Sequence, residues 1–321
     1  MKIESLILGG LCFGSSLNEI ESEIFLEKSF NLGIKDIDTG SLYGNGKSEN
    51  IIGNYMKKTN KIFNIHSKIG LERIKREDGS FGVKVAKLSN DYLIKSTEDA
   101  LEKIGQKNLF RISIHAFCSD VTAKEQIETI NYLLNKGLID SYGICNFNPE
   151  ELSYWIKTCL ENNLPLPKSL DLHFNIFEQR ALIDLFPLLE KYKIEAVPYR
   201  VFCRGLLADR YKSEKNLPSD SRASSSWRVR KYITEKYISN VNYLKILAEE
   251  NNYSLLSLIL EWTLSFECIN KVCIGTSSIL QLSEIVESLK RIKNDQNLFK
   301  KIDNNKLPLD FLEMPEVFFE T

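Results

Sequence analysis

Four side chains that can move protons lie at or just beyond the ends of three short apolar segments. Asp38 and Tyr43 are five residues apart in the turn after the first segment, Lys68 ends the second, and His115 ends the third. The carboxyl ends of parallel strands meet on one face of a barrel, so these side chains are expected to converge. A buried ammonium beside a phenol lowers the tyrosine pKa, and a carboxylate can hold that ammonium in place. The set predicts proton donation to a carbonyl oxygen, with Tyr43 as the acid.

Short apolar segments alternate with longer amphipathic segments along the 321 residues. The short segments predict strands and the long ones predict helices, with Asn18, Asn90 and Pro149 near helix starts. About eight alternations are typical of a single-domain (β/α)8 barrel, or TIM barrel, over residues 1–321. Alternatively, the first predicted strand, residues 4–8, closes the floor of the barrel and is not one of its eight strands. The predicted strands are residues 4–8, 33–37, 62–67, 109–115, 139–144, 169–174, 194–200 and 271–274.

Two insertions and a tail depart from this repeat. Residues 71–88, after the third strand, are rich in Gly and charge, and residues 208–227, after the seventh, are rich in Ser, Arg and Lys. Both predict long loops, either solvated or forming a substrate wall and a lid over a cofactor. The tail from Lys290 onward ends in the apolar residues 315–319 and is expected to dock near the active-site face.

The composition is that of an ordinary enzyme. It is 43% hydrophobic and 26% charged, with a net charge of −1, which argues against a nucleic-acid or membrane-surface protein. The chain has no apolar run of about 18 residues and no secretory signal pattern, so a cytoplasmic location is expected. Seven scattered cysteines indicate reduced thiols. The three histidines lack helical metal-ligand spacing, so no metal site is predicted.

Six motifs, in order along nearly the whole chain, resemble those of the aldo-keto reductase family. They are Asp38-Thr39-Gly40 with Tyr43-Gly44 and Ser48-Glu49, Ser67-Lys68, His115, Gly143-Ile144-Cys145-Asn146-Phe147, residues 201–207, and Ile274-Gly275-Thr276-Ser277. The resemblance implies an oxidoreductase that transfers hydride between NADP(H) or NAD(H) and an aldehyde, ketone or sugar. Asp38, Tyr43, Lys68 and His115 would form its catalytic tetrad.

The resemblance also implies how the nicotinamide is held. Cys145 and Asn146, after the fifth strand, and Asp171, on the sixth, stand where the family contacts the carboxamide, and Tyr199 stands where it stacks on the ring. The family has Ser and Gln where this chain has Cys145 and Asp171. A carboxylate accepts from an amide but cannot donate to it, and its charge is expected to favour the oxidised ring. Alternatively, Asp171 caps a neighbouring loop.

Two further loops resemble those that bind the cofactor phosphates. From residue 275 to residue 284 no Lys or Arg occurs, although the family usually places a basic residue there against the 2′-phosphate. Hydroxyl groups hold a phosphate less tightly than charged groups do. NADP is therefore expected first, with NAD as a serious alternative. The expected cofactor contacts in these loops are Arg200, Arg204, Gly205, Gly275, Thr276, Ser277, Gln281 and Glu284.

Side chains that alternate with the tetrad along the strands point to a second polar layer. Asp36, His66 and Ser113 are expected beneath the tetrad, and Arg111 deeper still. The layer is either a satisfied polar core or a set that biases the charge of the tetrad. Two other functions stay open: a cofactor-sensing regulatory subunit like the potassium-channel β subunits, and a non-redox lyase or dehydratase with a retained oxidised dinucleotide.

Overall fold

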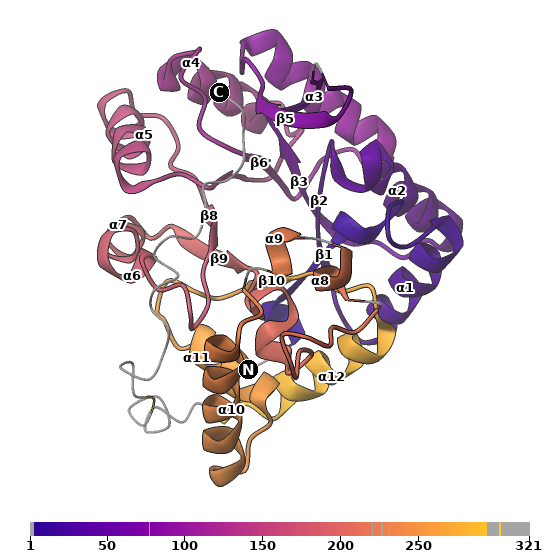
Figure 1. The fold of residues 1–321 in the computed structure, drawn as a ribbon. Coiled ribbons are helices and arrows are strands. Elements are labelled where there is room, and N and C mark those ends of the chain that lie inside the picture. Colours follow the sequence, from indigo (N-terminus) through magenta and orange to yellow (C-terminus); the bar gives the residue numbers. More distant parts are fainter. Residues whose placement is uncertain are drawn as a thin grey trace.

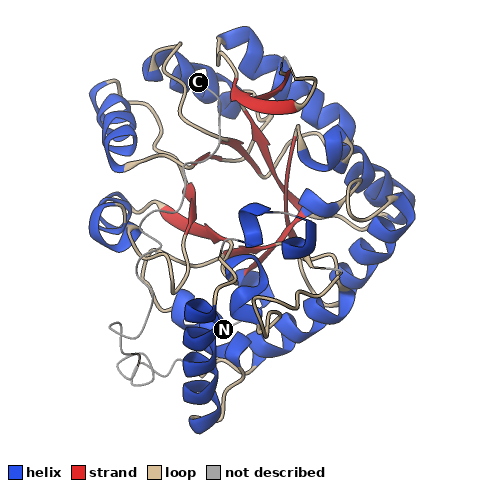
Figure 2. Cartoon of the chain, in the orientation of Figure 1, coloured by secondary structure: helices blue, strands red, loops and turns tan. Residues whose placement is uncertain are grey.

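Eight parallel strands form a closed barrel, and helices surround it in the computed structural model (Figures 1 and 2). The structure describes residues 3–293 and 302, apart from residues 77, 220, 226 and 231. Around the barrel the strand order is β1, β10, β9, β8, β7, β6, β3, β2. The bounds of these strands are β1 Leu6–Gly9, β2 Asp36–Gly40, β3 Asn64–Ile69, β6 Arg111–Ile114, β7 Tyr142–Cys145, β8 Ser169–His173, β9 Glu195–Tyr199 and β10 Val272–Ile274.

Helices follow the strands and cover the outside of the barrel (Figure 2). The long helices are α1 Glu19–Asn31, α2 Ser48–Thr59, α3 Asn90–Ile104, α4 Ala123–Asn135, α5 Pro149–Glu161, α10 Glu235–Glu250, α11 Leu255–Thr263 and α12 Ile279–Lys290. The short helices are α6 Ala181–Asp184, α7 Phe186–Tyr192, α8 Arg222–Ser225 and α9 Trp227–Arg230. The 3₁₀ helices are η1 Ile3–Ser5, η2 Gly10–Cys12, η3 Tyr43–Gly46 and η4 Cys203–Ala208.

Alternation along the strands separates an apolar outer face from a polar interior. Ile37, Ile65, Ile112 and Ile144 are at most 1% exposed and are part of the hydrophobic core. The residues between them include acids, bases and hydroxyls that face the interior, because neighbouring side chains point to opposite faces of a strand. The predicted (β/α)8 barrel is therefore confirmed, and it carries its polar groups inside.

The structure corrects several local expectations. The first strand, β1, pairs with both β10 and β2, so it is a barrel strand and not a floor strand. Residues 71–88 form an antiparallel hairpin of β4 (Leu71–Lys75) and β5 (Phe81–Val85), where a loop was predicted. The segment after β9 contains η4 and then α8 and α9. The tail expected at the active-site face lies outside the described residues beyond Lys293, except for Ile302.

All three residues expected near helix starts lie there, although Asn90 is the first residue of its helix and not its cap. Asn18 closes a capping box with Glu21 at the start of α1, and Pro149 occupies the first turn of α5. Asn90 is not the cap of α3, because the Ser89 side chain accepts from the Tyr92 backbone N–H instead. The Asn90 Oδ1 atom accepts a 2.7 Å hydrogen bond from Thr129 and so joins α3 to α4.

Gly44 fixes the turn that carries Tyr43. Its φ is +58°, and a Cβ atom there would lie 1.7 Å from the Phe13 carbonyl oxygen. We expect Gly44→Ala to lower the free energy of unfolding by about 1–3 kcal/mol more than Gly105→Ala, because the chain must move to relieve the overlap. Gly105 is the matched control, since its φ is +73° and nothing lies within 4 Å of its added Cβ. Urea denaturation measures both, and equal losses would show that only the backbone angle matters.

Candidate active site

A buried lysine between two carboxylates forms the centre of the barrel mouth. Lys68, near the end of β3, makes an ion pair with Asp38 of β2. Its Nζ atom also lies 3.1 Å from the Asp171 Oδ2 atom, on β8. The Cys145 thiol donates to the same Asp171 oxygen at 3.5 Å. All four residues are buried, so they form one compact group at the carboxyl ends of the strands.

Tyr43 and His115 lie beside this group. Tyr43 begins η3, just after β2, and His115 directly follows β6. Their ring centroids are 6.0 Å apart in an edge-to-face arrangement. The Lys68 ammonium is 5.9 Å from the centroid of the Tyr43 ring. The structure thus brings together the four residues of the expected tetrad.

Asn146 links the residues expected to hold the nicotinamide. Its φ is +61°, and its backbone N–H donates to the Asp171 carbonyl at 2.9 Å. Its Nδ2 atom donates to the His115 carbonyl at 2.9 Å, and its Oδ1 atom accepts from the Tyr199 hydroxyl. The Tyr199 ring also stacks on His173, with centroids 5.9 Å apart. Asn146, Asp171 and Tyr199 therefore share one connected wall of the site.

Burial controls the protonation of these groups. It raises the pKa of Tyr43 well above the ordinary value, with nearby cysteines and Asp171 acting in the same direction. The expectation of a lowered tyrosine pKa is wrong in this structure. Burial is the largest single effect on Lys68 and opposes its charge, but Asp171, Cys145 and Cys273 together outweigh burial, so the pKa of Lys68 is raised. Burial also lowers the pKa of His115 to about 3, with the Lys68 charge adding to the effect.

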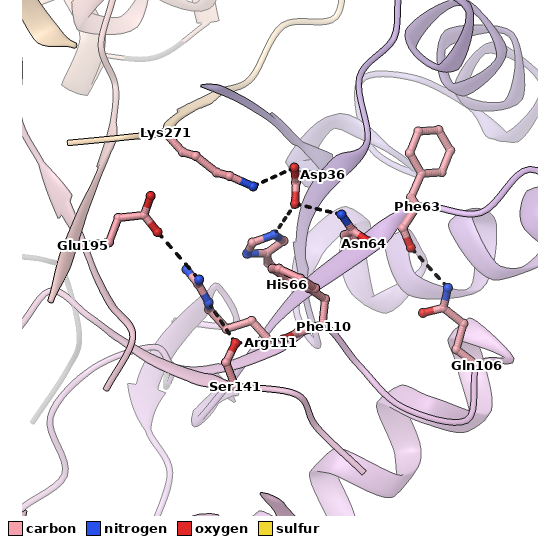
Figure 3. A network of polar contacts seen from close by, with 10 residues as sticks. All are labelled: Asp36, Phe63, Asn64, His66, Gln106, Phe110, Arg111, Ser141, Glu195 and Lys271. Carbon is pink, nitrogen blue, oxygen red and sulfur yellow. Dashed lines mark hydrogen bonds and ion pairs between the residues drawn. The ribbon is translucent and has the colours of Figure 1, made fainter. Parts of the chain in front are cut away.

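A second polar layer lies beneath the tetrad, toward the amino ends of the strands. Figure 3 shows Asp36 between His66 and Lys271, with contacts of 2.9 Å to His66 Nε2 and 2.8 Å to Lys271 Nζ. In the same view, the Arg111 guanidinium faces Glu195 at 3.7 Å. Asp36 and His66 were expected in this layer. Arg111 was expected deeper but is paired with His66 in the sheet, and Ser113 was expected here but is paired with Lys68. Lys271 and Glu195 were not expected.

The expected phosphate-binding residues lie in two other segments. Arg200 is exposed and lies over the Tyr199 ring at 5.4 Å, and η4 contains Arg204 and Gly205 at φ +58° and +97°. Between β10 and α12, the Thr276 hydroxyl donates to the Gln281 side chain at 2.8 Å. This second segment also contains Gly275 and Ser277, and α12 carries Glu284 on its exposed side. Neither of these two segments takes part in the contacts among Asp38, Tyr43, Lys68 and His115 that are described above.

Three residues at the site have interactions that the sequence reading missed. Asp171 was expected at the carboxamide but pairs with Lys68. Asn175, fully buried after β8, donates from Nδ2 to the Arg200 carbonyl at 3.1 Å, where the backbone φ is +58°. Cys273, on β10, is close enough to Tyr43 and Lys68 to help raise the pKa of each. A lone Asn after an apolar strand was the available signal for Asn175.

The chain is similar to known proteins over nearly its whole length. The model of the "Aldo/keto reductase family" matches residues 5–306. The chain belongs to this family. The "Uncharacterized oxidoreductase YqkF" of Bacillus subtilis is 25% identical over 289 residues, which are 90% of this chain and 88% of that protein. The "L-glyceraldehyde 3-phosphate reductase" of Escherichia coli (strain K12) is 23% identical over 320 residues, 95% and 89% of the two chains.

A solved structure shares the fold of this aldo/keto reductase. The glycerol dehydrogenase AKR11B4 from Gluconobacter oxydans matches with a TM-score of 0.81 and 21% identity, covering 99% of this chain and 95% of that one. Family and relatives together make the chain an NAD(P)-dependent oxidoreductase acting on small carbonyl molecules. Among the described residues, no helix is both long and apolar enough to cross a membrane. Those same residues contain no cluster of three or more potential metal ligands.

The low pKa of His115 predicts a pH dependence of stability. The unfolded chain binds a proton at histidine near pH 6.5, whereas folded His115 stays neutral to about pH 3. Its contribution is therefore complete above about pH 6.5 and is lost as the pH falls toward 3. Between about pH 6.5 and 4.5, we expect the free energy of unfolding of the wild type to fall more steeply than that of His115→Asn, by up to ~1.4 kcal/mol per pH unit.

Urea titrations at several pH values measure this difference directly. Both proteins keep His66 and His173, whose pKa values burial also lowers, so the difference between the two curves isolates His115. Parallel curves for the two proteins would contradict the prediction.

Proposed function

We propose that Tyr43 is the general acid of this oxidoreductase, with Asp38, Lys68 and His115 completing a catalytic tetrad. The observation that carries the proposal is the position of the Tyr43 ring at the mouth of the barrel, with its centroid 6.0 Å from that of the His115 ring and 5.9 Å from the Lys68 ammonium. Barrel enzymes place their reacting groups at this face. A bound nicotinamide dinucleotide would supply the hydride.

The residues present fit such a cofactor. The Asn146 amide has one N–H and one lone pair left after its contacts with His115 and Tyr199, because an amide offers two of each. It can therefore meet both polar atoms of a carboxamide. Asp171 offers a further acceptor, and Tyr199 offers an aromatic ring beside them. We propose that Asn146, Asp171, Cys145 and Tyr199 hold the nicotinamide end.

The protonation states suit carbonyl reduction. Tyr43 keeps its proton at neutral pH, as an ordinary tyrosine does, and burial raises its pKa further. An alkoxide is a much stronger base than a phenolate, so it still takes that proton. Neutral His115 can donate a hydrogen bond to the carbonyl oxygen, and Lys68 places a positive charge near the developing negative charge. Asp38 holds Lys68 in position.

Removing the phenol tests the acid. We expect Tyr43→Phe to lower kcat for carbonyl reduction by ~10²- to 10⁴-fold, the usual contribution of general acid catalysis. Dinucleotide affinity should stay nearly unchanged, because the proton is given only in the transition state. Steady-state kinetics and fluorescence titration of the cofactor measure the two effects. A mutant that retains more than half the wild-type rate would exclude Tyr43 as the acid.

We also propose NADP as the preferred dinucleotide, with NAD as the alternative. We expect Arg204 and Gly205 to contact the pyrophosphate, and Arg200 to lie beside Tyr199 at the nicotinamide end. We expect the residues after β10 to contact the adenosine end, with Glu284 toward the adenine amine. These residues are Gly275, Thr276, Ser277, Gln281 and Glu284. The Thr276 hydroxyl already bonds Gln281, and Ser278 caps α12, so both are engaged locally.

This local engagement predicts weak discrimination at the 2′-phosphate. One charge-assisted contact contributes about 1.5–3 kcal/mol, so without a basic residue we expect a preference of less than ~100-fold for NADP over NAD. The ratio of kcat/KM values for the two cofactors is the measurement. A preference above about a thousandfold would mean that basic ligands lie elsewhere in the chain.

The setting of the reaction is part of the same proposal. All seven cysteines are free, which fits a reducing compartment, and we place the enzyme in the cytoplasm. We infer that the chain works as one barrel domain, because β1 and β10 are neighbours in the closed sheet. Exposed Arg200 at the mouth suits a sugar-like or anionic carbonyl substrate. The regulatory-subunit and non-redox alternatives have no specific observation in their favour among the described residues.

A further inference from the structure

Asp171 is an additional buried carboxylate on the lysine of the tetrad. Its Oδ2 atom is 3.1 Å from the Lys68 ammonium, and its side chain is 11% exposed. Asp38 already pairs with the same ammonium from the other side. One positive charge is therefore shared by two negative charges. The backbone carbonyl of Asp171 accepts a hydrogen bond from the backbone N–H of Asn146. Asp171 therefore lies next to Asn146, which is one of the residues proposed to hold the carboxamide.

The other groups around Lys68 do not balance the extra negative charge. His115 is neutral above about pH 3, and the cysteine thiols stay protonated because burial raises the pKa of Cys145 well above its ordinary value and that of Cys273 to about 11. Tyr43 is also protonated. Arg200 is exposed at the rim, where solvent screens its charge. Two carboxylates therefore face one ammonium, and the formal charge of the buried group of Asp38, Lys68 and Asp171 is −1.

We propose that Asp171 is a specificity residue that favours the oxidised, cationic nicotinamide over the reduced, neutral one and so makes the bound cofactor a stronger hydride donor. The inference rests on the proposed function. During reduction, a hydride moves with its electron pair from the ring to the carbonyl carbon, and the alkoxide oxygen takes a proton from Tyr43. The ring gains one positive charge in this step, which a neighbouring anion stabilises.

The size of the effect follows from the charge and its screening. We take one negative charge near the ring at an effective dielectric of about 20, and solvent weakens its attraction for the oxidised ring further. The remaining attraction corresponds to a roughly fivefold change in the affinity for the oxidised form relative to the reduced form. For a two-electron couple, at 29.6 mV per tenfold, a fivefold change corresponds to about 20 mV in the potential of the bound cofactor. Product inhibition by oxidised cofactor should be correspondingly strong.

Calorimetric titration of the full-length protein with the oxidised and reduced forms of NADP and NAD tests the inference. Asp171→Asn removes the charge with little change of shape and leaves Lys68 paired with Asp38. We expect the ratio of the two dissociation constants to shift roughly fivefold, because the oxidised form loses affinity relative to the reduced form. Asp171→Gln is a second variant without the charge, and it should shift the ratio in the same direction.

Glu195→Gln is the matched control. It removes a largely buried carboxylate from β9, the strand next to β8. Glu195 belongs to the polar layer beneath the tetrad, which Figure 3 shows, and it faces Arg111 there. We expect its ratio to change less than that of Asp171→Asn. Equal changes in both affinities for the two Asp171 variants would overturn the inference while leaving the proposed function standing. Failure of the wild type to bind either form of the dinucleotides would overturn both.

Discussion

The burial of one ammonium group constrains the whole active site. Lys68 is only 6% exposed, and an unpaired charge at such a depth costs several kcal/mol. Its two carboxylate partners come from β2 and β8. Since β3 and β8 are not neighbours in the sheet, only a closed barrel brings Asp171 to Lys68. Barrel closure and charge compensation at Lys68 are thus one requirement.

The same constraint extends down the interior. Barrel layers usually consist of branched apolar residues. Here Asp36 pairs with His66 and Lys271, and Arg111 faces Glu195. The hydrophobic contacts that stabilise the fold lie instead between the outer faces of the strands and the helices, where Ile37 and Ile144 are completely buried. The barrel interior therefore contains these buried ion pairs, and the contacts between strands and helices supply most of the buried apolar surface.

The sequence predicts well what depends on local order. The alternation of segments predicts the barrel, and the spacing of Asp38 and Tyr43 predicts a shared rim. The hairpin of β4 and β5 also has a sequence signal, because Asp78-Gly79 lies between two runs of alternating residues and is typical of a tight turn. The Lys68–Asp171 pair was not readable in this way, since it joins strands that are separated by β6 and β7 around the barrel.

The predicted direction of the Tyr43 pKa shift was wrong for a related reason. A lysine near a tyrosine suggests a lowered pKa, but the observed direction is set by burial together with groups on β7, β8 and β10. Such a sum depends on several distant strands at once. No spacing of residues within one motif contains that information, so the direction of the shift becomes clear only when the barrel is assembled.

The contact between Lys271 and Asp36 has a consequence for synthesis of the chain. These residues are 235 positions apart, and their 2.8 Å hydrogen bond joins the last barrel strand region to the second. A growing chain on the ribosome exposes β1 and β2 long before β10 exists, so Asp36 must wait in solvent for its partner. The aspartate cannot be buried with both partners in place until the final strand arrives. We therefore expect the nascent barrel to remain open, with its ionic interior hydrated, until β10 has been synthesised.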